Sequence, residues 1–117
     1  MTDQSDSMTI IGRAEIDPTG RGAHDLGAKL DGGKIRADLL LDFRHALKEV
    51  AKVASFGAKK YAPGSWLHVP GGEVRYRAAR LRHQLEEGDD ADSGLAHLAH
   101  EAWNILAELE LRLRNGR

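Results

Sequence analysis

The stretch Asp90-Ala-Asp-Ser-Gly-Leu-Ala-His-Leu-Ala-His-Glu-Ala-Trp-Asn104 joins a polar turn to the start of an amphipathic helix, and it indicates a helical fold. At about 100° per residue, polar side chains share one arc of that helix. They are His97, His100, Glu101, Asn104 and Glu108. A second arc is apolar and can face a core, and it comprises Leu98, Ala102, Ile105, Leu109 and Leu113. The pattern predicts a helix over residues 94–114, capped by the last residues of the turn at residues 89–93.

The polar arc of this helix has the residue types of a metal site, because imidazoles and carboxylates are common metal ligands. The alternative is an ordinary solvated face. Solvated faces usually carry Lys, Glu, Arg and Gln, so two histidines with an asparagine favour a site. The chain has no cysteine, which leaves nitrogen and oxygen ligands. These donors suit Mg, Mn or Zn.

The rest of the chain also follows helical spacing. Apolar residues from Leu39 to Ala54 predict a helix that begins at Asp38 and ends near Phe56-Gly57, where the glycine is a plausible stop. Another helix is expected over residues 73–87. Residues 1–26 are polar and predict a flexible arm with at most a short strand at residues 8–11. We therefore expect an all-α bundle over residues 27–117.

Composition excludes several classes of protein. A length of 117 residues indicates one domain with a modest core, which oligomerisation would enlarge. The net charge of −1 gives no general electrostatic reason to bind nucleic acid or an anionic membrane. The sequence contains neither a membrane span nor a signal peptide, so a cytoplasmic protein is expected.

Two further segments resemble metal motifs without matching them. Asp90 to Glu101 spans the twelve positions of a calcium loop, but Gly94 comes one place too early. His97-x-x-His100-Glu101 has neither ligand order used by the zinc-protease helices. We therefore set both motifs aside.

A glycine- and lysine-rich loop spans residues 27–34. It is not a P-loop, because Ala28 and Ile35 occupy the positions of the first glycine and of the magnesium-binding hydroxyl. Its two lysines can still enclose a phosphate, and a plain solvated loop is the alternative.

The helix expected at residues 73–87 is densely cationic. Nucleic acid is a weak candidate partner, because the chain is slightly acidic and acidic residues follow this helix directly. Arginines beside an acidic metal face more often bind a compact polyphosphate. For Arg75 and Arg77, surface pairing with neighbouring acids is the favoured interpretation.

Four pieces in a fixed order resemble the dATP/dGTP diphosphohydrolases of phages and bacteria, the MazZ-like relatives of the all-α MazG nucleotide pyrophosphohydrolases. The resemblance covers roughly residues 27–111. The pieces are Gly27-Ala-Lys29-x-Asp31-x-Gly33-Lys34, Gly57-Ala-Lys-Lys-Tyr61 with Trp66, Arg75-Tyr76 with Arg82-His83, and Asp92-Ser-Gly-Leu-x-His97-Leu-Ala-His100 with Asn104.

The resemblance implies a helical homodimer or homotetramer that cleaves a deoxynucleoside triphosphate, dGTP or dATP, to the monophosphate and pyrophosphate. It implies Mg²⁺ or Mn²⁺, with candidate ligands Glu49, Asp92, Glu101 and Asn104. The candidate catalytic residues are Glu49, His83, His100 and Glu101. The candidate substrate contacts are Lys29, Asp31, Lys34, Lys59, Lys60, Tyr61, Trp66, Arg82 and His97. Trp66 stacks on the base in this interpretation, and a core position is the alternative.

The chain departs from the family pattern at two positions. Ala78 and Asn104 stand where many such relatives carry a carboxylate. These departures favour the alternative function, a non-catalytic helical module that binds a nucleotide or a protein.

Overall fold

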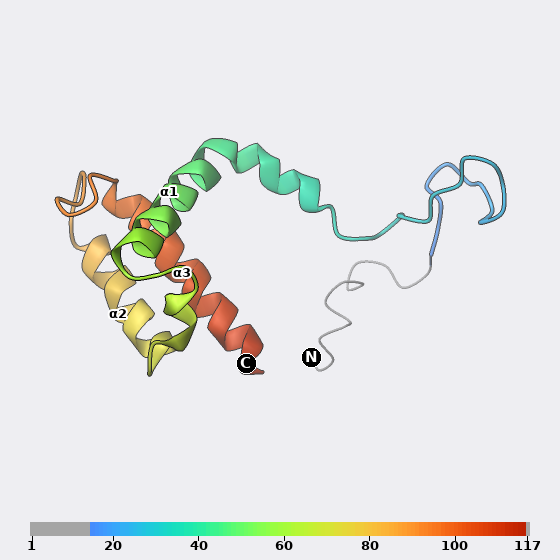
Figure 1. The fold of residues 1–117 in the computed structure, drawn as a ribbon. Coiled ribbons are helices and arrows are strands. Elements are labelled where there is room, and N and C mark those ends of the chain that lie inside the picture. Colours follow the sequence, from blue (N-terminus) through green and yellow to red (C-terminus); the bar gives the residue numbers. More distant parts are fainter. Residues whose placement is uncertain (1–14, 117) are drawn as a thin grey trace. The chain divides into compact units, whose positions relative to one another are not determined.

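The computed structural model describes residues 15–116. The described residues fall into two compact units, one that ends at Asp42 and one that begins at Phe43. All secondary-structure elements in the described residues are helices, which confirms the all-α prediction (Figure 1). The short strand predicted at residues 8–11 lies outside the described residues, as does most of the predicted arm.

Residues 16–32 form a loop that is held together at Asp17. The carboxylate of this buried residue accepts hydrogen bonds from the Thr19 hydroxyl (2.7 Å), the Thr19 amide (2.7 Å) and the Lys29 amide (3.0 Å). These donors, the Thr19 hydroxyl foremost, lower the pKa of Asp17. Ile16 forms an isolated antiparallel bridge to Gly32. A Cβ at Gly32 would lie 2.9 Å from the Ile16 carbonyl oxygen, so only glycine fits.

The first predicted helix occurs in two parts. A 3₁₀ helix, η2 (Ala37–Phe43), leads into α1 (Arg44–Lys60). No residue of η2 is buried, so packing does not favour the wider α turn there. The predicted end at Phe56-Gly57 was wrong: Gly57 does not take a left-handed conformation, and the helix continues to Lys60. Pro63 follows closely and disfavours further helical turns.

The two later helices are shorter than predicted. After the short 3₁₀ helix η3 (Ser65–His68), α2 spans Gly72–Gln84 and α3 spans His97–Arg114. The predicted side-chain cap of α3 is wrong, because Ala96 holds the cap position and makes no such bond. Gly94 has φ of +74°, and its amide donates to the Asp90 carbonyl (2.7 Å), so the turn stays outside the helix.

The second unit is organised around α3, which packs against α2 most extensively and also against α1 (Figure 1). Three aromatic rings join η3, α2 and α3. Trp66, Tyr76 and Trp103 meet edge to face, with ring centroids 5.5–6.2 Å apart. The Tyr76 hydroxyl donates to the Trp66 carbonyl (2.8 Å).

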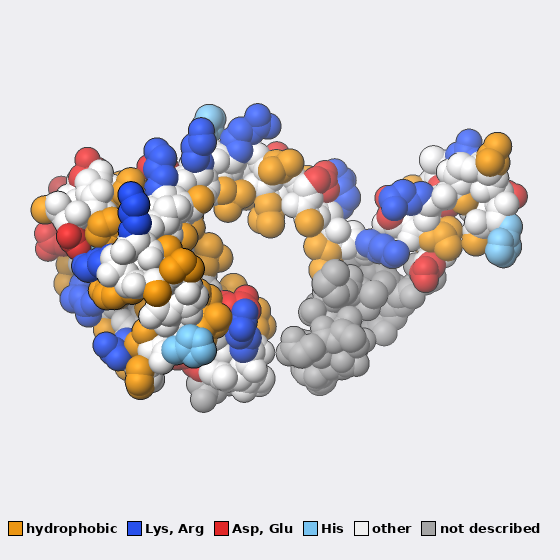
Figure 2. All heavy atoms as spheres, in the orientation of Figure 1, with side chains coloured by type: hydrophobic (Ala, Val, Ile, Leu, Met, Phe, Trp, Pro, Cys, Tyr) orange, Lys and Arg blue, Asp and Glu red, His pale blue; other side chains and the backbone are white. Residues whose placement is uncertain are grey.

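Among the described residues, the only buried hydrophobic side chains are Val53, Ala99 and Ala107, and none of them is fully buried, so the core is thin. Large hydrophobic side chains remain on the surface (Figure 2). An apolar groove lies between α1 and α3, and its walls include Leu47, Leu106, Leu109 and Leu113. None of the helices in the described part of the chain is long and apolar enough to cross a lipid bilayer.

Candidate functional site

The second unit contains a cavity of about 710 Å³. Its walls come from the end of α1, the η3 segment, α2, the loop between α2 and α3, and the first turns of α3. The polar and aromatic lining residues are Phe56, Lys60, Tyr61, Ser65, Trp66, Arg75, Tyr76, Arg82, His83, Asp90, Asp92, His100, Trp103 and Asn104. The cavity therefore combines cations, carboxylates, imidazoles and aromatic rings.

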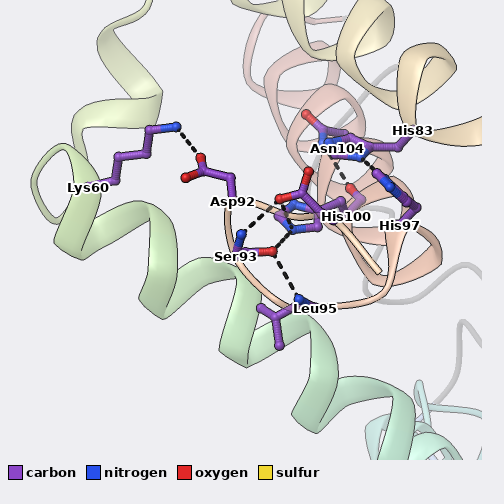
Figure 3. Close-up of polar contacts among 9 residues, drawn as sticks. Lys60, His83, Asp92, Ser93, Leu95, His97, His100 and Asn104 are labelled. Carbon is purple, nitrogen blue, oxygen red and sulfur yellow. Dashed lines mark hydrogen bonds and ion pairs between the residues drawn. The ribbon is translucent and has the colours of Figure 1, made fainter. Parts of the chain in front are cut away.

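Three histidines gather beside this cavity (Figure 3), and we call His83, His97 and His100 the histidine cluster. His83 lies in the last turn of α2, and the other two lie in the first turn of α3. The rings of His83 and His100 stack with centroids 4.5 Å apart and planes at 11°. The Nδ1 atoms of His83 and His97 are 2.9 Å apart. One face of α3 thus meets the last turn of α2 through imidazole rings.

The loop between α2 and α3 holds Asp90 against this cluster. The Asp90 amide donates to the Leu95 carbonyl (2.8 Å), and the His97 amide donates to the Gly88 carbonyl (2.9 Å). The Asp90 carboxylate accepts the Ser93 amide (2.9 Å) and lies 3.8 Å from His100 Nε2. The loop is closed by its own hydrogen bonds, which fix the carboxylate.

Burial governs the protonation of two members of the cluster, His83 and His100. Desolvation lowers the pKa of His100, and Asp90 opposes this only in part. Desolvation, with the neighbouring His100 and His97, lowers the pKa of His83. Burial works to raise the pKa of Asp90, but hydrogen bonds from Ser93 outweigh it and leave that pKa low. The site therefore favours neutral imidazoles beside an ionised carboxylate.

His100 is the most constrained member of the cluster, with 7% of its surface exposed. Its Nε2 lies 2.6 Å from the Ser93 hydroxyl. The Phe56 ring contacts it edge to face at 6.3 Å between centroids. The buried Asn104 donates its amide to the His100 carbonyl (2.8 Å). Because Nδ2 makes this bond, Oδ1 is the side-chain atom of Asn104 that can act as a ligand.

An ion pair lies at the cavity between α1 and the loop. Lys60 Nζ is 2.7 Å from the Asp92 carboxylate (Figure 3). The hydrogen bond and charge of Asp92 raise the pKa of Lys60. Both side chains are about half exposed, so water competes with the pair. An incoming anion can therefore replace Asp92 as the partner of Lys60.

Among the described residues, one group of three metal-ligating side chains comes close enough to share an ion. It comprises His83, Asp90 and His97, whose ligand atoms all lie within 4.8 Å of one another. Glu49 and Glu101 belong to no such group in the described chain, and Glu49 pairs with Lys52 (2.7 Å). The predicted ligand set of Glu49, Asp92, Glu101 and Asn104 stays a prediction.

The structure brings many of the predicted site residues together at the cavity: Lys60, Tyr61, Trp66, Arg82, His83, Asp92, His100 and Asn104. His97 joins them through His83. Glu49, Lys59 and Glu101 belong to the same unit but do not line the cavity. Lys29, Asp31 and Lys34 belong to the first unit.

Two residues were missed by the sequence analysis, Asp90 and Ser93. Asp90 was considered only as a calcium-loop ligand, and Ser93 only as part of a turn. Their spacing carried a signal, because an aspartate commonly accepts a backbone amide a few residues later in a turn. That bond is what aims Asp90 at the histidine cluster.

One of three comparisons with known proteins finds a match, and it identifies the family of the chain. The sequence profile of the family described as "dATP/dGTP diphosphohydrolase, N-terminal" matches residues 24–117. No curated protein and no solved structure matches the chain. The match covers the helical unit and the residues that line the cavity. The chain therefore belongs to the family defined by the N-terminal domain of the dATP/dGTP diphosphohydrolases.

Proposed function

We propose that this protein hydrolyses a deoxynucleoside triphosphate, dGTP or dATP, to the monophosphate and pyrophosphate. The observation that carries the proposal is the cavity itself. It gathers Lys60, Arg82, His83 and His100 from three separate sequence motifs, beside aromatic side chains. Such a combination fits a ligand with a base at one end and a charged polyphosphate at the other. A substrate of this kind implies a cytoplasmic location, that of the host cell if a phage carries the gene.

Lys60 and Arg82 are proposed to hold the phosphates. Lys60 is already hydrogen-bonded to a carboxylate, which shares its acceptor chemistry with a phosphate oxygen. Exchange of Asp92 for a phosphate would preserve the charge pairing of Lys60. Arg82 lines the same cavity and is exposed, so its guanidinium is accessible to a second phosphate oxygen.

Tyr61 is proposed to contact the base. It lines the cavity and is 72% exposed, so its ring has a free face. Trp66 packs edge to face with Tyr76 and Trp103, which makes the core position the better interpretation for this ring.

His100 or His83 is proposed to accept a proton from the attacking water. Both imidazoles have lowered pKa values, so they are neutral near pH 7 and have a nitrogen lone pair available. Asp90 lies 3.8 Å from His100 Nε2 and would stabilise the charged ring that proton transfer creates.

We also propose that activity needs Mg²⁺ or Mn²⁺. A bound divalent cation would lower the pKa of water and offset charge on the phosphates. The proposed ligands are Glu49, Asp92, Glu101 and Asn104, whose side-chain oxygens are the donors that such an ion prefers. Comparing metal affinity and turnover in Glu101→Gln with the unmodified protein tests the proposed role of Glu101.

The active form is proposed to be a homodimer or homotetramer. The described part of this unit has three buried hydrophobic side chains, which are few for its size, and the groove between α1 and α3 is apolar. A second copy of the same chain would cover these surfaces in the manner of a bundle core. No nucleic acid or membrane partner is proposed.

A non-catalytic nucleotide- or protein-binding module is the second candidate. One observation favours it: the amide of Asn104, which replaces an expected carboxylate, is already used to bind the α3 backbone. Measuring pyrophosphate release from each deoxynucleoside triphosphate with Mg²⁺ or Mn²⁺ separates the two candidates, because the module would bind a nucleotide without turnover.

A further inference from the structure

Three ligand-bearing side chains converge beside the cavity from different parts of the second unit. His83 comes from the last turn of α2, Asp90 from the following loop, and His97 from the first residue of α3. The expected magnesium or manganese ligands of the family resemblance do not include Asp90. This triad therefore needs its own explanation.

The spacing of the triad fits a single ion. One ligand atom from each residue lies within 4.8 Å of the other two, and the two Nδ1 atoms are 2.9 Å apart. Two nitrogens bound to one tetrahedral ion, each about 2.0–2.1 Å from it, are roughly 3.3 Å apart. Small rotations of the two rings are therefore enough to admit an ion between them.

The triad is held in place by contacts that do not involve an ion. Hydrogen bonds within the loop fix Asp90, as described above, and the stacked ring of His100 supports His83. The Nε2 atom of His100 lies 2.6 Å from the Ser93 hydroxyl, so this nitrogen already has a hydrogen-bonding partner. His100 therefore orients the triad and need not bind the metal itself. Supporting contacts of this kind raise metal affinity by lowering the cost of ordering the ligands.

The donor set decides which metal fits. Two imidazoles and one carboxylate suit first-row transition metals, whereas Mg²⁺ and Ca²⁺ prefer sites made of oxygen alone. Three protein ligands also leave coordination positions free for water or a phosphate oxygen.

We propose that His83, Asp90 and His97 bind one divalent transition-metal ion of the Mn²⁺-to-Zn²⁺ series. The site opens beside Lys60 and Arg82, so its ion would face the phosphates of a nucleotide in the cavity. That role for the ion rests on the proposed function, but the binding of the ion does not.

Cobalt titration tests the site without any nucleotide. Chelator-stripped, full-length protein is titrated with Co²⁺, whose visible absorption reports a nitrogen-containing ligand set, and Zn²⁺ is then added as competitor. We expect one Co²⁺ per chain, displacement by Zn²⁺, and no displacement by millimolar Mg²⁺. Asp90→Asn and His97→Gln should each weaken binding by roughly 10–100-fold or more. His68→Gln is the matched control, because this exposed histidine lies on η3 and outside the triad.

Asp90→Asn keeps an oxygen that can accept the Ser93 amide, so the loop should survive the change. Circular dichroism checks that each variant is folded, and His83→Gln replaces any variant that is not. Folded unmodified protein that binds no Co²⁺ or Zn²⁺ would overturn the proposal. So would binding that is equally strong in Asp90→Asn, His97→Gln and the control. Neither result depends on hydrolysis, so a failed metal site and a failed enzyme activity remain distinguishable.

Discussion

His83 and His97 lie fourteen residues apart in sequence, yet their Nδ1 atoms are 2.9 Å apart. Only one of the two nitrogens can donate the proton in such a contact, so the other must accept it. The contact joins the last turn of α2 to the first residue of α3. The contact therefore exists only where these two helices pack against each other.

The metal-free protein should lose stability as the pH falls below about 6.5. Both His83 and His100 have pKa values below their ordinary value of 6.5, so the folded state binds protons less tightly than the unfolded chain. When the pH lies between the pKa of a histidine in the folded protein and its pKa in the unfolded chain, the unfolded chain holds more protons. Acid therefore favours unfolding. Urea denaturation in chelator at pH 8, 7, 6 and 5 measures the trend. A flat profile, or greater stability at pH 5, would contradict the assigned burial of these rings.

Ser93→Ala should destabilise the protein by about 1–3 kcal/mol. The change removes the hydroxyl that lies 2.6 Å from His100 Nε2 and accepts the Leu95 amide at 3.1 Å. It leaves a buried ring nitrogen without that partner. Ser55→Ala is the control, because Ser55 is exposed and bonds only a carbonyl of its own helix. Equal free energies of unfolding for the two variants would show that the Ser93–His100 contact contributes no stability.

Lys60→Met should raise KM for the nucleotide roughly tenfold, because a cationic phosphate contact would be lost. Its melting temperature should change little, since the Lys60–Asp92 pair is about half exposed. Lys48→Met is the matched control on the same helix, and Lys48 does not line the cavity. A similar KM for the two variants would remove Lys60 from the proposed phosphate site.

Leu109→Glu should dissociate the oligomer. Leu109 lines the groove between α1 and α3 and is 50% exposed, so a charge there would oppose burial against a second copy. Light scattering after gel filtration measures the mass. Val74→Glu is the control, because Val74 is exposed on α2 and outside the groove. A monomeric unmodified protein would contradict the proposed assembly.

Helical periodicity was sufficient to predict the fold class, because the apolar spacing of α1, α2 and α3 is set by residues within each segment. The boundaries were less predictable. Gly57 can continue a helix as readily as it can end one, and here it continues. Gly94 takes a left-handed conformation that delays the start of α3, and only the closed turn at Asp90 explains why.

The candidate site was partly predictable, because helical spacing also places polar side chains on one face of α3. His97, His100 and Asn104 share a helix face by spacing alone, and the structure gives them neighbouring contacts. The approach of His83 and Asp90 depends on how the loop after α2 closes on itself, which helical spacing cannot express. The part played by Ser93 was hidden for the same reason.

Pyrophosphate release directly tests the proposal that this protein hydrolyses a deoxynucleoside triphosphate. The folded protein is incubated with dATP, dGTP, dCTP and dTTP separately, each with Mg²⁺ or Mn²⁺, and both products are measured. The proposed function predicts equal amounts of pyrophosphate and monophosphate from dGTP or dATP, and none after chelation of the metal. Binding of these nucleotides without either product, in saturating Mn²⁺, would contradict it and identify a binding module.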